Sequence, residues 1–331
     1  MSEKNSNYSF AAARVKAIES RLITKDKLGR LMESKDFDSA MRILQELGYG
    51  QSVASKDSFE QLINNELSEA DDLLIFLSPS DVFIKIMRTQ KDYHNLKILI
   101  KLTMLNQDLD SIELTPGNIS VEILKRAISE NDYRELPQTM TDALVYIDKQ
   151  FASVNDVSIV GITLDKAYAK EINTLIHDMH DPLVSAYFQA YFDLSNIIAF
   201  MRIRLSGYGK EVFEKTFFEG GNIEKNTFIN AFDLSDENIY NSLFKGDFSR
   251  AFSSAFAEYQ KSKNLYMLEK ARDDYLLQML RAKWHDMFGI GPLMCYYIAK
   301  QREAAAVRMV MTAKLGGINA DVVSERMKEL F

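Results

Sequence analysis

The sequence has few of the residues that break helices, form disulfides or bind metals. Among its 331 residues are 14 Gly, 5 Pro, 4 His and 1 Cys. Because Gly and Pro are the usual helix breakers, stretches of 20 or more residues without either favour long helices. One cysteine excludes an intrachain disulfide, and four histidines leave little material for a metal site. We therefore predict an all-α protein of the reducing cytoplasm with no cofactor.

Basic charge and long apolar runs are also missing. The formal net charge is −7, whereas nucleic acids and anionic membranes bind surfaces with surplus Lys and Arg, so we expect no nucleic-acid partner. The most apolar window, from Leu183 to Phe200, contains Gln189, Asp193 and Asn196, and charge inside a bilayer is costly. We interpret this window as a buried core helix. We expect no transmembrane segment, and the polar N-terminus indicates no export signal.

A short glycine motif occurs three times along the chain. It reads Gly-Asn-Ile at residues 117–119 and 221–223 and Gly-Gly-Ile at 316–318, with spacings of 104 and 95 residues. Because these spacings match a small domain, they indicate internal duplication and not a phosphate loop. We predict that each Gly ends a helix in the left-handed conformation and that the Asn caps the next helix, as Thr24 would.

The duplication predicts three similar helical domains, residues 1–116, 117–220 and 221–331. One additional piece lies at each end of the chain, at residues 8–23 and 320–331. Such end pieces can cover the seam of a repeat array that closes on itself. We therefore expect the first and last helices to pack together in one domain.

A second recurring signal is an Asp followed by an aromatic residue, at Asp36, Asp132 and Asp247. Asp is a favourable N-cap, and Glu135 follows Asp132 at the spacing of a capping box. Each Asp therefore predicts the start of a helix. The more irregular stretches 51–59 and 152–163 are predicted to be loops.

Polar side chains recur at helical spacing in otherwise apolar helices. Two interpretations stay open: they form buried networks that fix the register of the helices, or they line an inner surface that binds a partner. The residues are Asp92, Asn95 and Lys101 in one copy, Asp193, Asn196 and Arg202 in the next, and Arg302 and Arg308 near the C-terminus.

The sequence contains little that suggests catalysis. The cluster HDMHD at residues 177–181 has the residue types of a metal phosphohydrolase, but such a site needs a further His and Asp. Since Pro182 follows directly, we interpret the cluster as a solvated helix end. Neither phosphate-loop motif is present, and Cys295 lies in an apolar segment typical of a buried, inert thiol. We predict no catalytic residue, cofactor or metal site.

Each end of the chain carries a set of residues that together form a recognisable pattern. The set is Gly291, Pro292, Tyr297, Glu303, Val307, Arg308 and Lys314 at the C-terminus, and Tyr8, Arg14, Val15, Glu19, Leu22 and 48–50 (GYG) at the N-terminus. With these residues the chain resembles the C subunit of bacterial and archaeal V-type and A-type ATPases, which is related to the d subunit of the vacuolar enzyme. The C-terminal segment departs from that family at residues 304–306, which are alanines where the family often carries an Asn.

The resemblance implies three similar helical domains in a pseudo-threefold, funnel-like arrangement and a non-catalytic role. Such a protein receives the central shaft of the ATPase in its cavity and rests on the membrane proteolipid ring, peripheral to the cell membrane. The expected partners are therefore the shaft subunits and the ring, and the expected process is proton or sodium ion transport coupled to ATP. The alternatives are a free-standing helical-repeat adaptor and, less favoured, an all-α metal phosphohydrolase.

Overall fold

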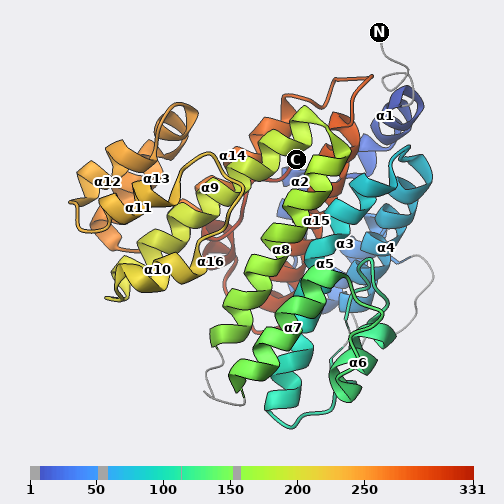
Figure 1. Ribbon diagram of the computed structural model, residues 1–331. Helices are drawn as coiled ribbons and strands as arrows, with labels where there is room; N and C mark the ends of the chain where they lie inside the picture. The colour runs from blue at the N-terminus through green and yellow to red at the C-terminus, as the bar shows by residue number, and fades with distance from the viewer. Residues whose placement is uncertain (1–7, 51–58, 113, 152–157) are drawn as a thin grey trace. The chain divides into compact units, whose positions relative to one another are not determined.

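The computed structural model describes residues 8–50, 59–112, 114–151 and 158–331 (Figure 1). Helices are the only regular elements in this part of the chain, so the all-α prediction is confirmed. The chain forms two compact units, one from residues 1–81 with 273–331 and the other from residues 82–272. This division neither supports nor opposes the boundaries at 117 and 221, and the three-domain funnel stays a prediction.

The first unit is built from both ends of the chain. The long helix α15 packs against α1, α2, α3, α4 and α16, and both chain ends belong to this unit. Its helices are α1 (Tyr8–Ala17), the short 3-10 helix η2 (Glu19–Arg21), α2 (Lys25–Glu33), α3 (Phe37–Glu46), α4 (Phe59–Leu77), the end of α14 (Tyr266–Arg281), α15 (Gly291–Leu315) and α16 (Ala320–Glu325). Direct packing of the first helix on the last stays a prediction.

Residues from distant parts of the sequence form the core of this unit. Leu31 and Leu44 are fully buried in the same apolar cluster as Val307 and Met311. Burial of side chains of this kind contributes about 1.5–3 kcal/mol each relative to exposure. The N-terminal helices therefore depend on α15 for much of their stability.

The second unit contains the middle of the chain. Figure 1 shows α7 and α8 side by side, and α8 also packs against α9 and α10. The elements are most of α5 (Asp81–Met104), α6 (Val121–Glu130), α7 (Gln138–Phe151), α8 (Ser158–Met179), α9 (Pro182–Leu205), α10 (Lys210–Thr216), α11 (Lys225–Ala231), α12 (Asp236–Leu243), α13 (Asp247–Ser262) and the start of α14.

The helix α9 is the core helix that the apolar window predicted. On this helix, Phe200 packs its ring against Phe213, Phe228 and Phe232, with ring centroids 5.4, 5.7 and 5.5 Å away. Such aromatic pairs stabilise a core beyond the area they bury. Among the described helices, none combines the length and apolar character needed to cross a membrane.

The three long helices α5, α9 and α15 end in the same way. Asn106, Gly207 and Gly317 each have a left-handed backbone, with φ of 52°, 73° and 63°. The N–H of the following residue then donates to a carbonyl five residues earlier, which closes the helix. Gly317 is therefore equivalent to Gly207, at a helix end, and not to the glycines of the two Gly-Asn-Ile motifs.

Only part of the predicted capping is observed. Thr24 and Asp36 are N-caps, because their side chains accept hydrogen bonds from the N–H groups of Lys27 and Ser39. Asp132 is not a cap. It pairs with Arg134, and α7 begins only at Gln138.

The other local predictions have mixed outcomes. Glu135 forms an ion pair with Arg126 and closes no capping box. A helix does start at Asp247, but Asp247 is the first residue of α13 and Gly246 is its N-cap. The loop predicted for 152–163 is wrong from Ser158 onward, because α8 begins there, and the loop predicted for 51–59 is wrong at Phe59, the first residue of α4. The rest of these two loops, 51–58 and 152–157, lies outside the described residues.

Candidate functional site

A buried carboxylate on α5 binds the first Gly-Asn-Ile motif. Asp92 accepts hydrogen bonds from the backbone N–H groups of Asn118 and Ile119, both at 3.0 Å. The side chain of Asn118 also donates to Asp92, at 3.1 Å, and to the carbonyl of Lys85, at 3.0 Å. A carboxylate that receives several N–H donors is well satisfied although it is buried. Asn118 is therefore part of this contact and not the cap of α6, which is Ser120.

The same contact is repeated on α9. Asp193 accepts from the N–H groups of Asn222, at 3.0 Å, and Ile223, at 2.9 Å. In both copies a Cβ on the glycine, Gly117 or Gly221, would overlap the Oδ1 atom of the aspartate. Neither glycine has a positive φ. The prediction that they end helices in the left-handed conformation was therefore wrong; they let the loop approach the carboxylate.

The two asparagines three residues further on bind the same loops. Asn95 donates from Nδ2 to the carbonyl of Thr115 at 2.9 Å. Asn196 donates to the carbonyl of Phe218 and accepts from its N–H, both at 2.8 Å. Both asparagines are buried. Each long helix thus binds its loop through an Asp and an Asn on one face.

A third contact of this kind lies in the first unit and uses both ends of the chain. Glu303 on α15 accepts from the N–H of Ile23 at 2.7 Å. Ile23 precedes Thr24, the N-cap of α2, just as Ile119 and Ile223 precede the N-caps of α6 and α11. Glu303 follows Asp193 by 110 residues, and Asp193 follows Asp92 by 101. We call Asp92, Asp193 and Glu303 with their loops the three acid contacts.

The third acid contact carries a buried ion-pair network in addition. Lys300 lies 2.6 Å from Glu303 and 2.5 Å from Glu66, and the hydroxyl of Tyr49 donates to Glu303 at 2.6 Å. Both Lys300 and Glu303 are almost fully buried. Since a buried charge is costly unless it is paired, these partners are what makes the site tolerable.

The electrostatics of the buried groups follow from burial and pairing. Burial raises the pKa of Asp92 to about 6, although its N–H donors act in the opposite direction. The pKa of Asp193 is raised for the same reason. Burial alone would lower the pKa of Lys300, but Glu303 and Glu66 reverse this and the pKa is raised. Lys300 is therefore positively charged at neutral pH.

The structure places the eight predicted partner-binding residues in two groups. Asp92, Asn95, Asp193 and Asn196 are buried and bonded within the chain, as described above. The other four are basic residues. Lys101 is exposed, and Arg202 is 59% exposed and pairs with Glu269. Arg308 binds both carboxylate oxygens of Glu60, at 2.8 and 3.0 Å. Arg302 is only 12% exposed. Their role in binding a partner stays a prediction.

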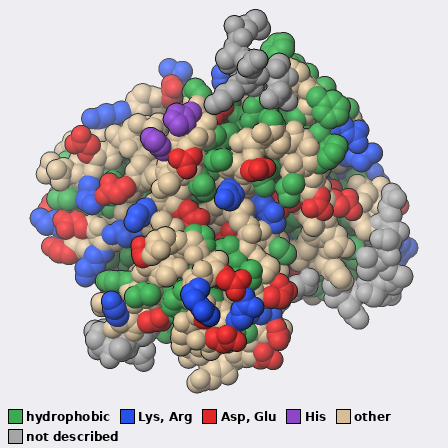
Figure 2. All heavy atoms as spheres, turned by 45° about the vertical axis from the view of Figure 1, so that its right-hand side comes forward, with side chains coloured by type: hydrophobic (Ala, Val, Ile, Leu, Met, Phe, Trp, Pro, Cys, Tyr) green, Lys and Arg blue, Asp and Glu red, His purple; other side chains and the backbone are tan. Residues whose placement is uncertain are grey.

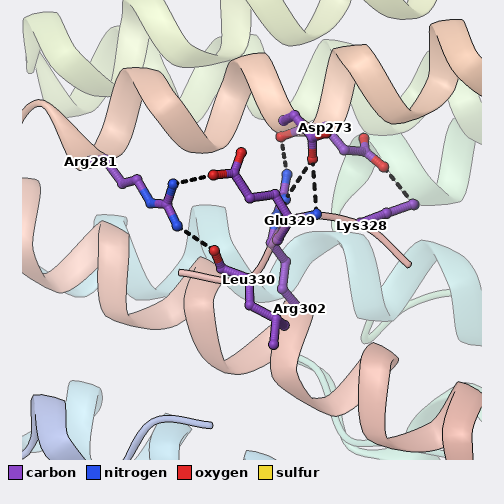
Figure 3. A network of polar contacts seen from close by, with 7 residues as sticks. Asp273, Arg281, Arg302, Lys328, Glu329 and Leu330 are labelled. Carbon is purple, nitrogen blue, oxygen red and sulfur yellow. Dashed lines mark hydrogen bonds and ion pairs between the residues drawn. The ribbon is translucent and has the colours of Figure 1, made fainter. Parts of the chain in front are cut away.

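Arg302 belongs to a network that fixes the C-terminal segment (Figure 3). It donates to the backbone carbonyl of Glu329 at 2.7 Å, and Arg281 pairs with the carboxylate of Glu329 at 2.5 Å. Arg281 also reaches the carbonyl of Leu330, and Lys328 pairs with Asp273 at 2.5 Å. Residues 328–330 are thereby held against α14 and α15.

Sequence reasoning missed several residues of these two networks. The family resemblance alone points to Glu303 and Tyr49, and nothing in the sequence predicts a role for Lys300, Glu66 or Arg281. One signal was available for Glu303, since it is an acidic residue in an apolar helix at a repeat distance from Asp193. The partners that Glu303 and Lys300 bind outside α15 lie more than 230 residues away along the chain and leave no local pattern.

The HDMHD cluster is a helix end, as predicted. The helix α8 ends at Met179, and Asp181 caps α9 by accepting from the N–H groups of Leu183 and Val184 at 2.9 and 3.1 Å. Within the described ranges, no group of three or more His, Cys, Asp or Glu residues is arranged to hold a metal ion. Cys295 is buried, and burial raises its pKa to about 12, which keeps the thiol protonated and unreactive.

The geometry thus consists of three acid contacts, two polar networks and surface arginines, without a catalytic constellation among the described residues. The model of the ATP synthase (C/AC39) subunit family matches residues 11–326. The chain belongs to this family. It is 25% identical to the C subunit of the V-type sodium ATPase of Enterococcus hirae over 96% of the chain and 97% of that protein. It is 22% identical to the C subunit of the A-type ATP synthase of Methanocaldococcus jannaschii, over 96% of the chain and 85% of the relative.

Membership in the C/AC39 family confirms the resemblance drawn from the two ends of the sequence. The chain is a subunit of a rotary ATPase of the V or A type, and within such a complex it is an accessory, non-catalytic component. Ion transport and ATP synthesis are processes of the complex as a whole. The phosphohydrolase alternative is therefore set aside.

Proposed function

We propose that the chain couples the rotating central shaft of a V-type ATPase to the proteolipid ring in the membrane. The match of the family model to nearly the whole chain and the similarity to C subunits of two rotary ATPases support this proposal. In it, the shaft subunits and the ring are the partners, and the chain lies peripheral to the cell membrane on the cytoplasmic side. The coupling serves ATP-driven transport of protons or sodium ions.

The observation that best supports a mechanical role is the repetition of the acid contacts on three long helices. Lys101 and Arg202 both lie nine residues after the aspartate of their helix, and Arg308 lies five residues after Glu303. Rigidly held helices that present basic side chains at related positions suit a partner with repeated, distributed contacts. Each exposed ion pair contributes only about 0–1 kcal/mol, so several together are needed to transmit torque.

The funnel-like arrangement of three domains is part of the same proposal. The third acid contact joins the N-terminal segment to α15. A repeat whose last copy is completed by the first residues of the chain suits a closed arrangement around a central axis. In such an arrangement the three long helices would surround the shaft.

The second candidate function, a free-standing adaptor, differs from the first only in its partner. Tagged protein isolated from detergent-solubilised membranes distinguishes the two. We expect the shaft subunits and the ring protein to be recovered with it in fixed proportion. Recovery of the chain without either of them would favour the adaptor.

Reversal of charge at Arg202 and Arg308 tests the proposed shaft contact. We expect Arg202→Glu with Arg308→Glu to leave the helicity unchanged, to weaken binding to the purified shaft subunits by about tenfold or more, and to lower the number of ions transported per ATP. Reversal adds repulsion to the loss of attraction, which makes it the sharper change.

Two control variants keep this test specific. Lys25→Glu with Lys245→Glu changes the net charge equally at exposed positions elsewhere. Glu60→Gln with Glu269→Gln breaks the same two intrachain ion pairs but keeps both arginines. Both controls should bind and couple normally. Normal binding by the arginine variant, or an equal loss in the Glu60 and Glu269 variant, would refute the proposed contact.

A further inference from the structure

A groove with an apolar floor and a basic rim lies in the second unit. It runs between α8 and residues 217–219, which follow α10, and its volume is about 620 Å³. Ala169, Phe217 and Phe218 contribute apolar surface, and Lys166 and Lys170 line the groove from α8. A concave surface of this composition, with a few charged groups at its edge, is typical of a binding site.

The wall opposite α8 is fixed by contacts within the unit. Asn173 on α8 donates from Nδ2 to the backbone carbonyl of Glu219 at 3.0 Å. Phe217 is buried and packs its ring against Phe213 and Phe228, with centroids 5.9 and 5.8 Å away. The groove is therefore preformed, so a ligand would not have to order it.

The charge of the groove is unbalanced. Lys166 and Lys170 lie one helical turn apart on α8, both are exposed, and neither has an ion pair with any described residue. Glu219, the acid in the opposite wall, is already paired with Lys225 at 3.0 Å. Burial, and after it the nearby Lys225, lowers the pKa of Lys166. Positive charge without a partner thus accumulates here, in a chain whose net charge is −7.

A second hollow of about 270 Å³ shares Asn173 and His177 with the groove and adds His180. The rings of His177 and His180 lie 5.4 Å apart. Figure 2 shows a face on which acidic and basic side chains are interspersed and two histidine side chains lie next to each other. The groove thus adjoins a second hollow that two histidines line.

We propose that this groove binds an acidic, apolar segment of another protein. Its carboxylates would lie against Lys166 and Lys170, and its apolar side chains would cover the half-buried Phe218. The apolar floor favours a peptide over a free phosphate, which would gain nothing from phenylalanine rings. The groove contains none of the eight residues proposed to contact the shaft or ring. The two proposals can therefore fail independently.

Binding of two defined peptides to the full chain tests this inference. Both are fluorescent peptides of about 14 residues with the same leucines at helical spacing, one carrying Glu and the other Lys at the remaining positions. We expect the acidic peptide to bind about tenfold more tightly, measured by anisotropy. Lys166→Glu with Lys170→Glu should remove this preference, whereas the matched variant Lys25→Glu with Lys245→Glu should retain it.

Several outcomes would overturn the inference. They are equal binding of both peptides, no binding of the acidic peptide at about 1 mM, or the same loss in both lysine variants, which would indicate net charge alone. Binding of vesicles with anionic lipids through Lys166 and Lys170, without peptide binding, would assign the groove to a membrane surface. Phe218→Ser tests the apolar contribution to binding. It should weaken binding of the acidic peptide, while the preference for the acidic over the basic peptide remains.

Discussion

In both units an acid contact binds a loop to a long helix, but the side chains that make the contact differ. In the second unit, the short carboxylates of Asp92 and Asp193 reach their loops only because Gly117 and Gly221 leave room for close approach. In the first unit the acid is the longer Glu303, and the residue two positions before Ile23 is Arg21. The acid of the first unit is thus longer by one methylene group, and its loop has an arginine where the loops of the second unit have a glycine.

The two kinds of contact also differ in how they compensate a buried charge. Asp92 and Asp193 are satisfied by N–H groups and have an asparagine three residues later that binds the same loop. The corresponding position after Glu303 is Ala306, and Lys300 and Tyr49 bind the carboxylate instead. We infer that the first unit compensates its buried carboxylate with a cationic side chain, whereas the second uses uncharged N–H donors.

Removal of Glu303 should therefore have the largest effect. Glu303→Ala leaves Lys300 with Glu66 alone and removes the acceptor of Ile23 and Tyr49. Breaking a buried ion pair in this way costs about 3–5 kcal/mol. We expect a loss of this size in the free energy of unfolding, measured with urea. A loss below about 1 kcal/mol would mean that water replaces the carboxylate and that the network is dispensable.

The pH dependence of the free energy of unfolding tests the description of Asp92 and Asp193 as buried carboxyl groups. The pKa of Asp92 is about 6 in the folded chain against an ordinary value of 3.8. The folded chain therefore binds the proton of Asp92 more tightly than the unfolded chain does. The free energy of unfolding that this contributes is fully present below pH 3.8 and is lost as the pH rises through about 6. A shift of about two pKa units corresponds to about 3 kcal/mol.

Asp92→Asn removes this titration. Between about pH 4 and pH 7, the free energy of unfolding of the original chain should fall by up to about 3 kcal/mol relative to that of the variant. Asp193→Asn should shift in the same direction, since burial raises that pKa too. If the difference in free energy of unfolding between the original chain and its variant stayed constant across this range, burial would not raise the pKa of these carboxyl groups.

The glycine requirement should give the smallest effect of the three. A methyl group at Gly117 or Gly221 forces the loop away from the aspartate, so each change to Ala should destabilise the chain by about 1–3 kcal/mol. Gly29 lies in α2 with open space around its Cβ position, and Gly29→Ala should stabilise by about 0.5–1 kcal/mol. The thermal midpoints of the three variants check this, and a gain at Gly117 or Gly221 would refute the close-approach explanation.

The sequence predicted the helices well because their signals are local. Scarce Gly and Pro, apolar periodicity and caps such as Thr24 and Asp36 act within a few residues. Asp132 shows the limit of such signals. It looks like a cap from its neighbours, yet Arg134, two residues later, pairs with it and the helix starts elsewhere.

The repeat was recognised from the Gly-Asn-Ile motifs, but its third copy was placed incorrectly. Gly-Gly-Ile at 316–318 looks similar in letters and is instead the end of α15. The true third contact has Glu in place of Asp, Leu22 in place of Asn, and 280 residues between its two partners. Only tertiary structure brings such a pair together, so no pattern within a short window predicts it.

Backbone amide exchange tests most directly whether the three acid contacts are equivalent. The N–H groups of Ile23, Ile119 and Ile223 should all be protected from hydrogen exchange in the intact chain, because each donates to a buried carboxylate. Glu303→Ala, Asp92→Ala and Asp193→Ala, which remove the acceptor altogether, should each speed exchange at their own isoleucine and leave the other two unchanged. Fast exchange at Ile23 in the intact chain, or protection at Ile23 unaffected by Glu303→Ala, would contradict a third contact built from both ends of the chain.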